Sequence, residues 1–313
     1  MKRVLITGAT GFVGQHLTEL LSANNEYEIF GTSLTEHNSP NEKVKIEKID
    51  LSNPDDVLSL VNKTEPDLIY HLAALTSPAD SFSNPTPVVL GNIEIQMNLL
   101  NAVRNSGFKP RILVVSSAEV YGLISASDLP IDESTPMRPA NPYAVSKIAQ
   151  DYLGLQYHLS YKMDIIRVRP FNHTGPGQGP GFVVPAFSGQ IAKIEKGKQE
   201  PILKVGNLLA KRDFTDVRDI VKGYLMLMEK GVSGEVYNIG SGKSHSMQEL
   251  LDTLLSLTDK KIVIENDPAR QRPSDVADIF SDCKKLSSLT GWKPEIPIEK
   301  TLQDTLDYWR GVV

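Results

Sequence analysis

The chain has 313 residues, with 38 acidic against 33 basic side chains and a net charge of −5. This balance lacks the basic surplus of nucleic-acid-binding proteins, so we expect no nucleic-acid partner. The single cysteine, Cys283, excludes an intramolecular disulfide and argues against a cysteine-based metal site, so no metal is expected. No apolar run approaches the roughly 20 residues of a membrane span. We therefore expect no membrane association and a cytoplasmic location.

Short apolar segments alternate with helical patterns through the first half of the chain. Five segments are expected as strands: Val4–Ile6, Glu28–Phe30, Val44–Glu47, Leu68–His71 and Ile112–Ser116. Three intervening stretches are expected as helices: Val13–Ala23, Pro54–Asn62 and Asn92–Ser106. Strands that are nearly continuous hydrophobics are typical of a parallel sheet with helices on both faces. The alternation predicts an α/β fold with a Rossmann-type doubly wound parallel sheet.

The pattern continues with a helix expected over Pro142–Tyr161 and a strand over Asp164–Arg169. Beyond that strand the chain becomes rich in glycine and proline, and its elements become shorter. We therefore predict a dinucleotide-binding domain over residues 1–170 and a smaller, mainly substrate-binding lobe over 171–313. Later segments, at about 210–240, are expected to be interleaved with the first domain.

A glycine-rich turn follows the first expected strand directly. Its sequence is Gly8-Ala9-Thr10-Gly11-Phe12-Val13-Gly14, a GxxGxxG pattern. Glycine permits a tight turn and close approach of the backbone to a diphosphate, and the next helix presents its N-terminal amides to that anion. This strand-to-helix context predicts a dinucleotide site at Gly8, Gly11, Phe12, Val13 and Gly14.

The end of the second strand bears on the choice of dinucleotide. NAD-binding folds carry an acid there for the ribose hydroxyls, whereas Gly31–Leu34 contains none and the first acid is Glu36. A hydroxyl such as that of Thr32 offers a weak contact to a 2′-phosphate. We therefore favour NADP(H), with NAD(H) as the alternative. Asp50 and Leu51 are expected at the adenine edge, although Asp50 equally suits a helix cap.

Tyr143 and Lys147 stand four residues apart, which places them on one face of the expected helix. A nearby cation stabilises a phenolate and lowers the pKa of a tyrosine, so the pair suits proton transfer with a carbonyl or an alcohol. Ser117 follows a strand, at the carboxyl edge where parallel sheets bind ligands. Taken alone, a Tyr/Lys pair at this spacing is more often a solvated helix face.

With these motifs together, the chain resembles the extended short-chain dehydrogenase/reductase family along essentially its whole length. The resemblance implies that Ser117 holds the reacting oxygen, Tyr143 moves the proton and Lys147 binds the nicotinamide ribose. It also implies cofactor contacts from the segment after the fourth strand and from the end of the sixth, namely Leu72, Ala73, Ala74 and Pro170, together with Tyr143 and Lys147.

Most extended members act on nucleotide sugars, and the later segments indicate which one. Asn172-His173 and the Gly-Pro-Gly-Gln that follows resemble the GDP-mannose branch. Arginines suit a diphosphate and a carboxylate suits a sugar diol. The resemblance implies substrate contacts from Thr76, Glu119, Asn172, Arg212, Arg272 and Asp275. Helix capping for Thr76, and surface salt bridges for Arg212 and Arg272, are the alternatives.

Glu119 stands where sugar 4,6-dehydratases keep the base that removes the C5 proton. Ala118 stands where those enzymes have an acidic or hydroxyl residue, and alanine has no proton to give. The resemblance therefore implies reduction of the 4-keto group of GDP-4-keto-6-deoxy-D-mannose to GDP-D-rhamnose. GDP-mannose 4,6-dehydration and nucleotide-sugar epimerisation remain alternatives, and a non-enzymatic NADP-binding scaffold is disfavoured by the intact Tyr/Lys pair. A homodimer is expected through the two long helices.

Overall fold

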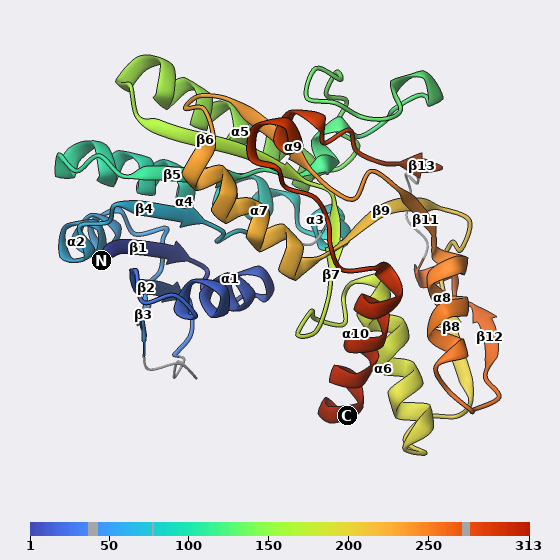
Figure 1. Cartoon of the computed structure of the whole chain (residues 1–313). Coiled ribbons are helices and arrows are strands. Elements are labelled where there is room, and N and C mark those ends of the chain that lie inside the picture. Colours follow the sequence, from blue (N-terminus) through green and yellow to red (C-terminus); the bar gives the residue numbers. More distant parts are fainter. Residues whose placement is uncertain (37–42, 77, 271–275) are drawn as a thin grey trace.

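A seven-stranded parallel sheet forms the centre of the computed structural model, which describes residues 1–36, 43–76, 78–270 and 276–313 (Figure 1). The strand order is β10-β6-β5-β4-β1-β2-β3, and every neighbouring pair is parallel. The strands are β1 (Lys2–Thr7), β2 (Tyr27–Ser33), β3 (Val44–Lys48), β4 (Leu68–His71), β5 (Arg111–Val115), β6 (Asp164–Pro170) and β10 (Val236–Ile239). This arrangement confirms the predicted Rossmann-type sheet.

Helices cover both faces of the sheet (Figure 1). One face packs against α1 (Phe12–Ser22), α7 (Val217–Lys230) and α9 (Lys284–Thr290), with Leu17 and Tyr224 in the shared core. The other face packs against α2 (Pro54–Thr64), α4 (Pro85–Ser106) and α5 (Pro142–Tyr161), with Leu99 and Tyr157 in its core. Burial on both faces explains the nearly continuous hydrophobic strands.

The start of each long helix follows from its first residues. Asn141 caps α5 by accepting a hydrogen bond from the Ala144 amide at 2.7 Å, and Pro142 occupies the first turn. Helix α4 begins at Pro85, earlier than the predicted start at Asn92. Prolines in its first turn cost no hydrogen bond, because those amides have no partner within a helix. Asn92 is therefore an interior, fully buried residue.

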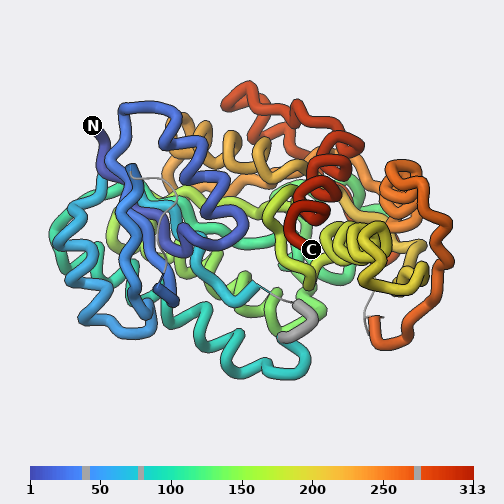
Figure 2. The backbone as a smooth tube through the Cα atoms, turned by 90° about the horizontal axis from the view of Figure 1, so that it is seen from below, coloured from blue at the N-terminus to red at the C-terminus, as the bar shows by residue number. Residues whose placement is uncertain are grey.

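The second lobe gathers at one end of the molecule. In Figure 2 the yellow α6 (Val183–Glu195) and the orange α8 (Met247–Ser256) lie at the end opposite the blue strands. Helix α10 (Ile298–Val312) packs against both. The lobe also contains small sheets, formed by β7 (Asn172–Thr174), β9 (Lys211–Asp216), β11 (Ser244–Ser246) and β13 (Asp278–Ile279), and by β8 (Ile202–Val205) and β12 (Val263–Asn266).

Short elements complete the chain: α3 (Pro78–Ser83), η1 (Ala118–Tyr121), η2 (Ala126–Asp128) and η3 (Pro268–Arg270). Between β9 and β11 the chain returns to the central sheet: α7 packs on one face of that sheet, and β10 pairs with β6 at its edge. Within the described ranges, no helix has both the length and the apolar character needed to cross a membrane.

A buried ion pair joins α5 to the sheet. The carboxylate of Asp151 is fully buried and accepts hydrogen bonds from Arg167 and from Arg169 on β6. The Arg169 guanidinium also contacts the Tyr121 hydroxyl at 3.0 Å. Removal of one partner from such a network leaves an uncompensated buried charge, so this contact fixes the position of α5.

Candidate active site

A cleft lies at the carboxyl edge of the central sheet, where its strands face the second lobe. Its walls come from the glycine-rich turn, the ends of β4, β5 and β6, the start of α5, and β7 and β9 of the lobe. The predicted residues that line it are Gly8, Gly11, Phe12, Val13, Gly14, Leu72, Ala73, Ala74, Thr76, Ser117, Glu119, Tyr143, Lys147, Pro170, Asn172 and Arg212. Arg272 and Asp275 lie outside the described residues.

The glycine-rich turn brings bare backbone to the cleft. Gly8 has a φ of +71°, and a Cβ at Gly14 would lie 2.3 Å from the Gly8 carbonyl oxygen. Both positions therefore require glycine. Helix α1 starts after Gly11 with no side-chain cap and no acidic residue in its first turn, so its amides and positive dipole end face the cleft. These features fit a dinucleotide diphosphate.

Three residues predicted to bind the cofactor do not line this cleft. The hydroxyl of Thr32 accepts a hydrogen bond from the Gly8 amide at 3.1 Å and so supports the turn. Asp50 is exposed and accepts from the Ser52 amide at 2.9 Å, while Asn53 caps α2. The Leu51 side chain is buried in the core between the sheet and α2. A role for these residues in binding the adenosine remains a prediction.

Tyr143 is buried in the cleft wall beside Ser117. Burial raises the pKa of the Tyr143 phenol above its usual value; a hydrogen bond with the Ser117 side chain lowers it in part, and the nearby carboxylate of Glu119 raises it. The Nζ of Lys147 lies 5.9 Å from the centre of the Tyr143 ring and donates its hydrogen bonds to other groups, so the expected lowering of the Tyr143 pKa by Lys147 stays a prediction. Tyr143 therefore keeps its proton at neutral pH.

Lys147 lies one helical turn along α5, with its side chain 4% exposed. Its Nζ donates to the main-chain oxygen of Val115 at 3.0 Å and to Oε1 of Gln150 at 2.8 Å. Burial lowers the pKa of the ammonium to about 7. Burial, and to a smaller extent the positive charge of Lys147, lower the pKa of His71, at the end of β4, to about 3. His71 is therefore neutral at physiological pH.

Asn141 is a site residue that the sequence analysis missed. Its amide Nδ2 donates to Oε2 of Glu119 at 2.8 Å while its oxygen caps α5. Asn141 thus ties the Glu119 carboxylate to the helix that carries Tyr143. An asparagine directly before Pro142 is a recognisable helix-start signal, but the contact across to Glu119 depends on the tertiary fold.

The lobe supplies the opposite wall. Asn172 is exposed and lines the cleft, and Arg212 donates to the Val276 oxygen at 2.6 Å. His173 stacks on Phe12 with ring centroids 6.2 Å apart, which links β7 to the glycine-rich turn. Gln178, from the Gly-Pro-Gly-Gln stretch, also lines the cleft, as do Phe82, Phe182 and Tyr224, which the sequence analysis did not single out. The cleft therefore combines backbone amides, aromatic rings and hydrogen-bonding side chains.

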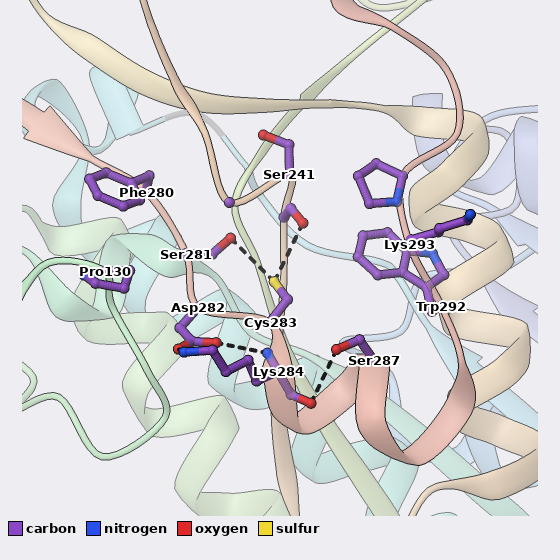
Figure 3. A pocket seen from close by; sticks show the side chains of 13 residues that line it. Pro130, Ser241, Phe280, Ser281, Asp282, Cys283, Lys284, Ser287, Trp292 and Lys293 are labelled. Atoms are coloured by element: carbon purple, nitrogen blue, oxygen red, sulfur yellow. Dashed lines mark hydrogen bonds and ion pairs between the residues drawn. The ribbon is translucent and has the colours of Figure 1, made fainter.

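A second hollow surrounds Cys283 and shares no lining residue with the cleft (Figure 3). The Cys283 thiol donates to the Gly240 oxygen and contacts the Ser281 hydroxyl at 3.2 Å. Burial raises the pKa of this thiol to about 12. Because the thiolate is the reactive form of cysteine, this raised pKa disfavours reaction at Cys283.

Comparison with known proteins identifies the family. A family model for GDP-mannose 4,6 dehydratase matches residues 5–305. The chain belongs to this family of nucleotide-sugar enzymes. The resemblance to the extended short-chain dehydrogenase/reductases is thereby confirmed, and the chain is a member of an enzyme family.

Three similar proteins illustrate the range of this family. GDP-6-deoxy-D-mannose reductase of Pseudomonas aeruginosa is 36% identical over 312 residues, covering 100% of this chain and 98% of the relative. The structure of RMD from Pseudomonas aeruginosa, complexed with NADPH, is 34% identical with a TM-score of 0.89 and full coverage of both chains. The UDP-glucose 4-epimerase of Thermus thermophilus, in complex with NAD, is 27% identical with a TM-score of 0.88, covering 99% of this chain and 100% of that one.

These similarities support the binding of a nicotinamide dinucleotide to the cleft. The glycine-rich turn, the uncapped start of α1 and the absence of any side chain at Gly14 fit that ligand. The bound cofactor differs among the similar structures: RMD is complexed with NADPH and the UDP-glucose 4-epimerase with NAD.

Proposed function

We propose that the protein reduces the 4-keto group of GDP-4-keto-6-deoxy-D-mannose to GDP-D-rhamnose, which is GDP-6-deoxy-D-mannose. The observation that carries this proposal is the cleft itself, where a protonated Tyr143, its hydrogen-bonded Ser117 and a buried Lys147 meet at the dinucleotide-binding turn. The full-length similarity to a GDP-6-deoxy-D-mannose reductase supports the choice of substrate.

Each of the three side chains has a proposed part in the reaction. When bound, the nicotinamide cofactor supplies the hydride. Ser117 holds the carbonyl oxygen by hydrogen bonding, and Tyr143 donates its proton to that oxygen as it becomes an alcohol. Lys147 would hold the cofactor ribose with the N–H that its two protein partners leave over, and would stabilise the phenolate left on Tyr143.

Reduction fits the site better than dehydration. Elimination of water from GDP-mannose requires a base at C5 and an acid for the 6-hydroxyl. Glu119 is tied to Asn141 at 2.8 Å, and its neighbour Ala118 has no proton to give. A tyrosine that retains its proton at neutral pH is already in the form that a carbonyl reduction consumes.

The test supplies the keto sugar with NADPH and follows the absorbance of the reduced nicotinamide, with GDP-mannose alone run in parallel. We expect NADPH to be oxidised with the keto sugar and GDP-mannose to remain unchanged. Conversion of GDP-mannose without net cofactor use would identify a dehydratase and make Glu119 the base. Epimerisation without added cofactor, together with copurifying NAD, would identify an epimerase.

NADPH is the proposed cofactor. The end of β2 has no acid before Glu36, and Lys48 pairs in register with Ser33 at that point. The ammonium of Lys48 is largely exposed and lies 3.7 Å from Glu36, so it would have to leave this carboxylate to bind a 2′-phosphate. Lys48→Ala is expected to weaken NADPH binding more than NADH binding. An equal effect on both would refute this preference.

The long helices α4 and α5 are proposed as the face of a homodimer. Exposed Leu90 and Met97 on α4 stand seven residues apart, as do Val145, Tyr152 and Leu159 on α5. Each helix thus presents an apolar stripe. Tyr152→Glu is expected to give monomers in analytical ultracentrifugation, whereas Leu209→Glu at an exposed lobe position should not. A cytoplasmic location remains a prediction.

A further inference from the structure

The amide of Gln150 faces Lys147 in a fixed orientation. Its Oε1 accepts from the Lys147 ammonium at 2.8 Å, and its Nε2 donates to the main-chain oxygen of Asn92 at 2.7 Å. An ammonium only donates hydrogen bonds and a carbonyl oxygen only accepts them, so neither contact survives a reversal of the amide. The main chain of α4 therefore sets which end of Gln150 meets the lysine.

This contact lies in a dry part of the α4–α5 interface. Gln150 is 1% exposed and Asn92 is fully buried. Gln96 on α4 donates to the main-chain oxygen of Gln150 at 2.7 Å, and Asn92 donates to the Ser146 hydroxyl at 2.9 Å. Both the backbone and the side chain of Gln150 are thereby held, and in a dry interface each of these hydrogen bonds is costly to lose.

We propose that Gln150 is the positioning residue for Lys147: its locked amide holds the ammonium at the floor of the cleft and favours the charged form. The inference rests on the proposed function, in which Lys147 supports Tyr143. The Val115 carbonyl takes a second N–H of the ammonium. The third N–H is then left for the cleft, where the cofactor ribose is expected.

The groups that accept hydrogen bonds from the Lys147 ammonium are uncharged. In the described part of the chain, no hydrogen bond or ion pair joins its Nζ to a carboxylate. Asp151, on the next turn of α5, is paired with the two arginines of β6. His71 faces Lys147 from β4 and is kept neutral by burial, and Glu119 acts on Tyr143 from η1. Gln150 is thus the side chain that offsets the burial of the charge.

Two substitutions of Gln150 are expected to change the pKa of Lys147 in opposite directions. Gln150→Met keeps the length of the side chain and removes the acceptor, whereas Gln150→Glu places a carboxylate beside the ammonium. Titration of 13Cε-labelled lysine by NMR in the cofactor-free protein reads the state of Lys147, with Lys147→Met to assign the resonance. We expect the Lys147 pKa to fall by about one to two units in Gln150→Met and to rise in Gln150→Glu.

Gln96→Met is the matched control, because it disturbs the same interface without touching Lys147. It is expected to lower stability and leave the titration unchanged. The alkaline limb of the kcat/KM profile should follow the NMR shifts, moving to lower pH in Gln150→Met. An unchanged titration in both Gln150 variants, or an equal shift in Gln96→Met, would overturn the inference. A wild-type protein inactive towards the keto sugar would refute the proposed function alone, since the NMR titration needs no substrate.

Discussion

Replacement of Tyr143 by phenylalanine separates proton donation from the rest of the site. The substitution removes one hydroxyl from a side chain that is 7% exposed and hydrogen-bonded to Ser117. Ser117 still accepts from the Glu119 amide at 3.2 Å, so the expected loss of stability is only about 1 kcal/mol. Loss of the proton donor is expected to lower kcat/KM by about 10²–10⁴-fold, or roughly 3–5 kcal/mol of transition-state stabilisation.

The assay measures NADPH oxidation by the keto sugar, together with NADPH affinity and urea-induced unfolding of the same samples. Cofactor affinity is expected to change by no more than a few fold. Tyr121→Phe is the control, because its buried hydroxyl contacts Asn238 at 2.7 Å and Arg169 at 3.0 Å but does not line the cleft. That variant should lose more stability and keep its activity. A fully active Tyr143→Phe enzyme would refute the assignment.

Three further predictions concern the turn, the lysine and the buried ion pair. Gly14→Ala forces a Cβ to within 2.3 Å of backbone and should abolish NADPH binding measured by calorimetry; normal binding would contradict the fit. Lys147, with a folded pKa of about 7 against its usual 10.5, makes the wild type gain stability as pH rises between these values. The stability of Lys147→Met relative to wild type should therefore be constant below pH 7 and fall by up to about 1.4 kcal/mol per pH unit above it. A difference in unfolding free energy between the two proteins, measured with urea, that does not change with pH would contradict this. Asp151→Asn leaves two buried arginines without a counter-charge and should cost about 3–5 kcal/mol in urea unfolding, against less than about 1 kcal/mol for the more exposed Asp164→Asn; equal losses would refute the account.

The fold was predictable because its local signals agree with its tertiary structure. Helix α5 begins and ends at the predicted Pro142 and Tyr161, since an asparagine cap and a proline mark its start. Strand β4 has the predicted bounds Leu68–His71, because burial on both faces makes its first three residues apolar and leaves the only polar side chain at its end. Helix α4 starts before the predicted Asn92 because the prolines in its first turn resemble a loop in sequence.

Only those residues of the candidate site that belong to a local sequence motif were predictable. The glycine-rich turn and the Tyr143–Lys147 spacing are local patterns, and these residues line the cleft. Gln150 and Asn141 have no such pattern, since their roles depend on contacts with α4 and with Glu119 that the chain makes only once folded. The packing of α4 against α5 also makes Asn92, the predicted first residue of α4, a buried hydrogen-bonding residue in the helix interior.

The transfer of deuterium from cofactor to sugar tests the central claim most directly. NADPH carrying deuterium at C4 of the nicotinamide would be incubated with GDP-4-keto-6-deoxy-D-mannose, and the product analysed by mass spectrometry and NMR. The account predicts one deuterium at C4 of a GDP-6-deoxyhexose with the configuration of D-rhamnose. A product without deuterium, or consumption of GDP-mannose with loss of water and no oxidation of NADPH, would contradict it.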